Sequence, residues 1–181
     1  MNMHSVRIQK LTLAAVCLAL CMILPFLTGQ IPEIGSMLCP MHIPVLLCGF
    51  LCGPAWAAVV GAVAPLLRFM IFGMPPLFPV GVAMCVELAT YGAVSGLLYH
   101  ALPRKPMYVY VSLLSAMVAG RVVWGVVRLV LSGVSGTAFT WAAFLSGALT
   151  QAIPGMILHI VLIPAIVLAL QKALPWMTAR K

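Results

Sequence analysis

The sequence predicts an all-α integral membrane protein with six transmembrane helices. Hydrophobic residues make up 64% of its 181 residues and charged residues only 7%, with a mean hydropathy of +1.19. This composition is typical of a chain that crosses a bilayer several times. Its apolar runs are long and continuous, which favours helices over the short alternating segments of a β-barrel. A single domain over residues 1–181 accounts for this length.

The basic residues predict how the helices are oriented. Lys and Arg outnumber Asp and Glu by ten to two, and most of the basic residues flank apolar runs. By the positive-inside rule these flanking charges place both termini in the cytoplasm; they are Arg7, Lys10, Arg104, Lys105, Lys172, Arg180 and Lys181. Because the net charge of +8 reports topology, no nucleic-acid partner is expected.

The first half of the chain predicts three spans. The first, Leu11 to Thr28, carries Ala15 and Ala19, whose spacing allows another helix to approach closely. From spacing alone, ordinary packing inside the molecule is the favoured alternative. An outer loop of 13 residues follows, longer than most connections in helical bundles, which indicates a functional loop or lid. The second span, His42 to Leu51, is short, and a Gly-Pro turn leads into the third, Ala55 to Phe72.

The second half predicts three more spans and two outer loops. Three prolines stiffen the loop 73–79, which is typical of a lid or pocket wall, with a plain interfacial turn as the alternative. Val80 to His100 returns inward, and Met107 to Gly133 runs outward again. A short outer helix to about Thr150 precedes the last span, Gln151 to Leu174. Proline in this last stretch permits a kink.

Polar residues inside the predicted spans fall on one side of the membrane. His42, Arg68, Glu87, Arg128 and Gln151 lie in the outer half, and Arg121 lies near the centre. An arginine at mid-membrane costs about 2.5–3.5 kcal/mol on insertion scales, so such residues usually have a function. Their distribution predicts a ligand pocket in the extracellular half.

The charges in this pocket predict an anionic ligand. Three arginines face one intramembrane carboxylate, Glu87, and guanidinium groups bind carboxylate or phosphate in a bidentate fork. Aromatic and polar neighbours would add stacking and hydrogen bonds. The predicted substrate-binding residues are His42, Arg68, Glu87, Tyr91, Arg121, Trp124, Arg128 and Gln151. The alternative is that Glu87 and an arginine form a purely structural ion pair.

Other kinds of site find little support. The chain has only two carboxylates and neither a HExxH nor a GxSxG motif, so we expect no enzyme. The cysteine pairs Cys17/Cys21 and Cys48/Cys52 have no neighbouring histidine or carboxylate, so we expect no metal. Without a P-loop, this chain is not expected to bind ATP.

The motifs resemble those of a known family, the substrate-binding (S) components of energy-coupling factor (ECF) transporters. The Ala15-x-x-x-Ala19 pair matches the small-residue motif of the first helix in that family. The stretch from Gln30 to Gly49 (QIPEIGSMLCPMHIPVLLCG) is similar to the first loop and second helix of one S-component branch. The same holds for Gly73-Met74-Pro75-Pro76 at the third loop.

The resemblance implies a function and partners. It implies that a vitamin or vitamin precursor binds from outside, with pantothenate the first choice and folate the second. Ala15 and Ala19 would contact a transmembrane coupling subunit, and two cytoplasmic ATPase subunits would use ATP, with no cofactor on this chain. The location would be a bacterial plasma membrane. The alternative from the residues is a self-sufficient, proton-coupled carrier of a small organic anion, with Glu87 as its titrating group.

Overall fold

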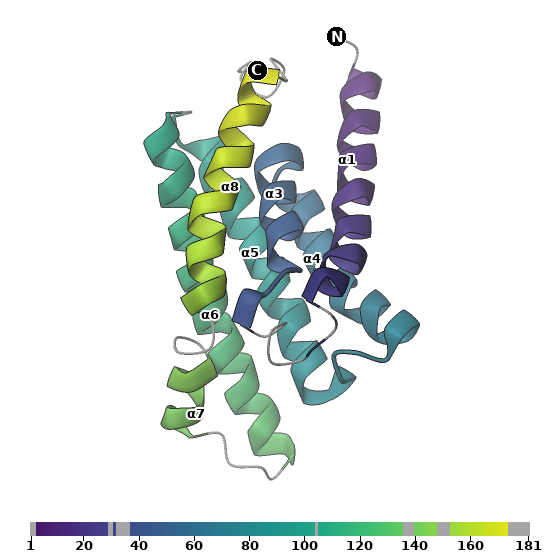
Figure 1. Ribbon diagram of the computed structural model, residues 1–181, viewed down its shortest axis with the longest axis vertical. Helices are drawn as coiled ribbons and strands as arrows, with labels where there is room; N and C mark the ends of the chain where they lie inside the picture. The colour runs from purple at the N-terminus through teal and green to yellow at the C-terminus, as the bar shows by residue number, and fades with distance from the viewer. Residues whose placement is uncertain are drawn as a thin grey trace.

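The computed structural model describes residues 3–28, 31, 37–103, 105–135, 140–147 and 153–173. Within these ranges all regular elements are helical (Figure 1). In chain order they are α1 (Met3–Ile23), η1 (Leu24–Thr28), α3 (His42–Cys52), α4 (Pro54–Phe72), η2 (Leu77–Gly81), α5 (Val82–Ala101), α6 (Pro106–Ser135), α7 (Trp141–Leu145) and α8 (Ile153–Ala173).

Five of the six predicted spans correspond to helices long and apolar enough to cross a membrane. These are Val6–Leu27, Pro54–Phe72, Leu77–Ala101, Pro106–Val134 and Ile153–Ala173. The remaining predicted span is α3, an apolar helix of 11 residues. At about 1.5 Å per residue it is only about 16 Å long, roughly half of a bilayer core. The chain is therefore a multi-pass membrane protein with one short internal helix.

Local sequence signals explain the helix ends. α4 begins at Pro54. Proline suits this first position because it lacks an amide hydrogen, and an amide hydrogen there would have no partner within the helix. The helix ends before Gly73, whose φ of 70° lies in the left-handed region that glycine adopts without strain. The predicted third span, Ala55 to Phe72, differs from α4 by a single residue.

The ends of the helices gather at two opposite ends of the molecule (Figure 1). The start of α1, the end of α8 and the connection from α5 to α6 lie at one end, at the top of Figure 1. The end of α6 and the short α7 lie at the opposite end. The flanking charges predict that the start of α1 and the end of α8 lie on the same side of the membrane, and the fold agrees with this. Which end of the molecule faces the cytoplasm stays a prediction.

α3 lies in the centre of the fold and determines where the site forms. All 11 of its residues are buried, and it packs against α1, α4, α5 and α8. The close contact with α5 depends on glycine, because a Cβ at Gly49 would overlap the Ser95 hydroxyl. A Cβ at Gly92 would likewise lie 2.6 Å from the backbone of Ala57 on α4. α5 is thus held tightly between two helices, so the side chains that it carries have fixed positions.

Buried thiols connect α1 to α3 and its preceding turn. The Cys21 thiol donates a weak hydrogen bond to the Met41 carbonyl oxygen at 3.7 Å, and the Cys52 thiol to the Lys10 carbonyl oxygen at 3.4 Å. Both thiols are buried at this helix contact, so they pack as small apolar groups that also satisfy backbone oxygens.

Candidate functional site

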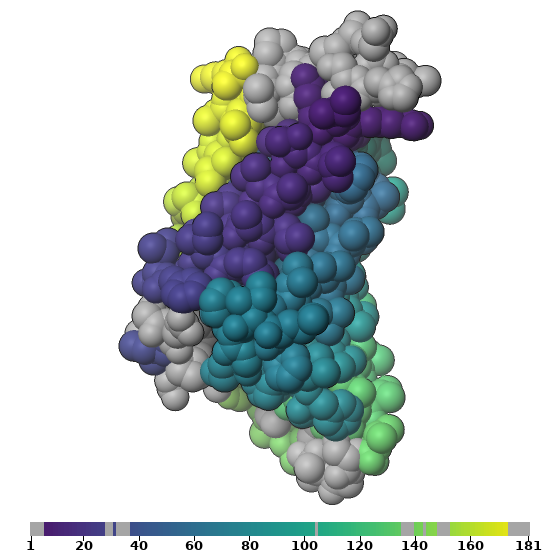
Figure 2. Space-filling model, turned by 90° about the vertical axis from the view of Figure 1, so that its right-hand side faces the viewer, coloured from purple at the N-terminus to yellow at the C-terminus, as the bar shows by residue number. Residues whose placement is uncertain are grey.

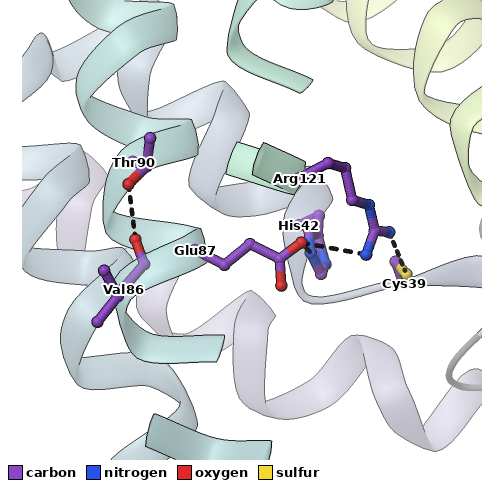
Figure 3. Close-up of polar contacts among 6 residues, drawn as sticks. All are labelled: Cys39, His42, Val86, Glu87, Thr90 and Arg121. Carbon is purple, nitrogen blue, oxygen red and sulfur yellow. Dashed lines mark hydrogen bonds and ion pairs between the residues drawn. The ribbon is translucent and has the colours of Figure 1, made fainter. Parts of the chain in front are cut away.

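A buried carboxylate, Glu87 of α5, lies at the centre of the site. It is 2% exposed, and its Oε1 atom is 3.2 Å from Nη1 of Arg121 on α6 (Figure 3). An isolated charge in such a position would be costly, so the ion pair supplies the compensation that burial requires. The structure therefore brings together two of the residues predicted to bind substrate.

His42 joins this ion pair from the start of α3. Its Nε2 atom is 3.6 Å from the same Glu87 Oε1 atom, and the ring is 3% exposed. Tyr91 lies edge-on to the His42 ring, with 5.0 Å between ring centroids, and it follows Glu87 by one turn of α5. Three helices thus contribute to one polar group inside an apolar bundle.

Two further residues complete what we call the Glu87 cluster: Cys39, His42, Glu87, Tyr91, Arg121 and His159. His159 of α8 stacks on His42 with ring centroids 6.0 Å apart. Arg121 Nη2 donates to the Cys39 sulfur at 3.6 Å. Cys39 lies outside the predicted spans; burial raises the pKa of its thiol, and the Arg121 guanidinium opposes that rise.

Several buried polar atoms of the cluster lack hydrogen-bond partners within the described ranges. They are both ring nitrogens of His42, Nε2 of His159, Nε of Arg121 and Oε1 of Glu87. Unsatisfied buried donors and acceptors are rare in native folds and need a specific explanation. The unpartnered Nε of Arg121 and its thiol-bound Nη2 together form the edge that binds a carboxylate in a bidentate manner.

Two glycines allow the cluster to form. A Cβ at Gly120 would lie 2.8 Å from the Tyr91 ring, so glycine lets that ring pack directly on α6 beside Arg121. A Cβ at Gly155 would lie 2.6 Å from the Met37 carbonyl oxygen, so glycine lets the backbone before Cys39 approach α8. Cys39 itself has a φ of 46°, an uncommon value for a residue with a side chain.

Arg68 of α4 has a different set of partners. Its Nη1 atom donates to the Met22 carbonyl oxygen at 3.0 Å, and its guanidinium lies 5.6 Å from the Phe26 ring centroid and 5.2 Å from that of Phe72. None of these partners belongs to the Glu87 cluster. The contacts give Arg68 a role in joining α4 to α1 and η1, and its predicted role in binding substrate stays a prediction.

Two other predicted residues, Trp124 and Arg128, lie further along α6. Trp124 is half-buried and stacks on Phe144 of α7, with ring centroids 6.3 Å apart. Arg128, also half-buried, lies one turn beyond it. At seven residues from Arg121 it is about 10 Å further along the helix axis. Gln151, the last predicted residue, lies outside the described residues.

Ala15 and Ala19 lie on the exposed side of α1. Both are exposed, whereas Ala14, Cys17 and Cys21 are buried. α1 runs along the surface of the molecule, as Figure 2 shows in purple. The two small residues are therefore accessible to another membrane protein, and their contact with a coupling subunit stays a prediction.

Sequence reasoning missed two members of the cluster. Cys39 carries no signal, because its contact with Arg121 joins residues 82 positions apart. His159 is not among the substrate-binding residues predicted from the sequence. His159 lies one turn after Gly155, which packs against the backbone of residues 37 and 38. This position indicates membership of the cluster only when the path of residues 37–41 is known.

Comparison with known families gives one result. A family model described as "ECF transporter, substrate-specific component" matches residues 9–167, from within α1 to within α8. Searches of curated proteins and of solved structures found no match to this chain.

Proposed function

The chain belongs to the family of ECF transporter substrate-specific components, and on that premise we propose that its Glu87 cluster binds a small anionic vitamin or vitamin precursor. Membership makes the chain a transporter subunit rather than an enzyme, one that works with membrane and ATPase subunits. The substrate class, the residues that bind it and the path of uptake are the proposal.

One observation carries the proposal: no carboxylate of the described residues contacts the Nε and Nη2 edge of Arg121. Glu87 occupies only Nη1, while Nη2 contacts a thiol and Nε has no partner among the described residues. A thiol is a weak acceptor compared with a carboxylate. An incoming carboxylate that displaced the Cys39 thiol would therefore gain two charge-assisted hydrogen bonds without breaking the Glu87 pair.

The surrounding residues suit a small organic acid. Tyr91 and His42 offer ring faces and polar tips beside Arg121, and Trp124 with Arg128 continues the same helix face one and two turns away. We propose that these residues contact the remainder of the substrate. Pantothenate, a short carboxylate with hydroxyl and amide groups, is the first compound to test, and folate is the second.

We propose that uptake depends on the partner subunits. The exposed Ala15 and Ala19 on α1 would contact the transmembrane coupling subunit, and two cytoplasmic ATPase subunits would use ATP, in a bacterial plasma membrane with the pocket in the extracellular half. Replacing both alanines with tryptophan would block close helix contact. We expect ATP-driven uptake to be lost while substrate binding to the purified chain is retained.

The direct test is to identify what the protein carries. The full chain is purified in mild detergent, denatured, and the released compounds are identified by mass spectrometry, with calorimetric binding of pantothenate and folate in parallel. A released carboxylate, or binding of either compound, is expected. Release of only cationic or neutral compounds, with no binding of either acid, would contradict the proposal.

The buried Glu87 also favours a second candidate, a self-sufficient proton-coupled carrier. A membrane carboxylate that gains and loses a proton is the usual element of such carriers. Vesicles that contain only this chain separate the two candidates. Rapid pantothenate accumulation driven by an imposed proton gradient would indicate the carrier, whereas no accumulation without the partner subunits is expected of an S component.

A further inference from the structure

We infer that a carboxylate enters this site together with one proton, which His42 takes up next to Glu87. The inference rests on the anion-binding function proposed above and concerns how binding is regulated by pH. It predicts that substrate affinity depends on pH even though the substrate itself stays ionised.

Charge balance gives the first reason. In the described structure the Arg121 cation and the Glu87 anion form one pair, so the pair has no net charge. A second carboxylate on the open edge of Arg121 would leave one guanidinium facing two anions in a buried environment. An uncompensated buried charge is strongly disfavoured. A proton taken up with the anion restores neutrality.

Geometry identifies His42 as the group that receives the proton. Its Nε2 atom lies 3.6 Å from Glu87 Oε1, so a protonated ring would face the carboxylate directly. Both of its ring nitrogens lack hydrogen-bond partners among the described residues, so no existing bond fixes the neutral form. The charges then balance. His42 takes its proton from solvent, Glu87 stays ionised, and Arg121 pairs with both Glu87 and the incoming anion.

The other groups around His42 fit this assignment less well. His159 stacks on His42 with ring centroids 6.0 Å apart, and it forms no ion pair with Glu87 within the described ranges. Tyr91 carries a neutral phenol, which does not gain a proton. The Cys39 thiol faces Arg121 and would be displaced. Arg128 lies two turns further along α6, about 10 Å along the axis, and is a permanent cation. If Arg128 supplied the compensating charge, no proton would be taken up.

Calorimetry measures the proton directly. Pantothenate is titrated into the full chain in lipid nanodiscs at pH 6 and pH 8, in buffers of equal pH but different ionisation enthalpy. The dependence of the observed enthalpy on the buffer gives the number of protons bound. We expect uptake approaching one proton at the higher pH, with affinity falling by up to about tenfold per pH unit. Pantothenol, in which an alcohol replaces the carboxylate, should bind without proton uptake.

Two variants are expected to act in opposite directions. His42→Gln removes the proton acceptor, so pantothenate binding should become weak and independent of pH. Glu87→Gln leaves Arg121 uncompensated, so pantothenate should bind at pH 8 more tightly than to the unmodified chain, again without proton uptake. His100→Gln is the matched control, because that ring hydrogen-bonds to Gly96 at the far end of α5 and should leave the proton number unchanged.

Each outcome separates this inference from the proposed function. Pantothenate binding without proton uptake, or equal pH dependence for pantothenol, overturns the inference and leaves anion binding in place. Loss of uptake in His159→Gln but not in His42→Gln shows that the proton acceptor is a different residue and overturns the assignment. If neither pantothenate nor folate binds at either pH, the anion-binding proposal fails, and this inference fails with it.

Discussion

Arg68 and Arg121 are both arginines in apolar helices, yet their surroundings differ. Arg68 donates a hydrogen bond to a backbone carbonyl oxygen and contacts two phenylalanine rings, and all three partners are neutral. Arg121 meets a carboxylate and a thiol and keeps one donor unpartnered among the described residues. The first arrangement satisfies a cation by contacts that join helices. The second combines a fixed charge pair with an edge still able to bind an acid.

The comparison shows that depth in the membrane does not assign a role to a charged residue. Both arginines lie in long apolar runs, and each is costly to bury. What separates them is the set of neighbours from other helices. A structural arginine should affect stability alone, whereas a binding arginine should affect both stability and affinity.

The largest expected effect is the loss of stability in Arg121→Ala. This change leaves Glu87 buried without its cation, and breaking a buried ion pair typically costs about 3–5 kcal/mol. Denaturant unfolding in detergent measures the loss. The double variant Arg121→Ala with Glu87→Gln should recover most of it, because the buried charge is then gone. Failure of the double variant to recover would mean that Arg121 stabilises the fold through packing instead.

The next effect is expected for Arg68→Ala. Loss of the hydrogen bond to Met22 and of two ring contacts should lower the free energy of unfolding by about 1.5–3 kcal/mol. If Arg68 has only this structural role, the Kd for pantothenate stays within about twofold of that of the unmodified chain. A tenfold or larger rise in Kd at matched folded fraction would instead place Arg68 in the binding site.

A smaller effect is expected for Gly120→Ala. The added methyl group would press on the Tyr91 ring, and overpacking of this kind typically costs about 1–3 kcal/mol. Because Tyr91 packs against His42 in the Glu87 cluster, the Kd for pantothenate should rise as well. Gly133→Ala on the same helix is the matched control, since no atom lies within 4 Å of its added Cβ. Equal Kd values in the two variants would exclude Tyr91 from the site.

The smallest effect is expected for Cys39→Ser. A hydroxyl oxygen accepts from a guanidinium better than a thiol does, so it should compete more strongly with an incoming carboxylate. We expect the Kd for pantothenate to rise by about threefold, with little change in stability. Calorimetry checks this, and tighter binding in the variant would contradict displacement of the Cys39 side chain.

Much of the fold follows from the sequence because long apolar runs mark the spans and local signals mark the ends of α4. Pro54 and Gly73 mark α4, and the short span predicted from His42 to Leu51 matches α3 within one residue. The central burial of α3 was not predicted, because it depends on glycine contacts between helices.

The site was predicted only in part, because it too depends on contacts between helices. The predicted spans placed Glu87 and Arg128 in the outer half and Arg121 near the centre, which grouped them into one predicted pocket. Periodicity gives no information on which helices are neighbours, so it did not separate Arg68 from Arg121. It also gave no sign of Cys39, which reaches Arg121 through a turn of unusual backbone geometry.

The most direct test of the central claim is a comparison of pantothenate with pantothenol in the unmodified chain and in Arg121→Ala with Glu87→Gln. The two compounds differ only where one has a carboxylate and the other an alcohol. We predict that the unmodified chain prefers pantothenate by at least about 100-fold at pH 6, and that the double variant loses this preference. An unchanged preference in the double variant would show that the carboxylate binds elsewhere.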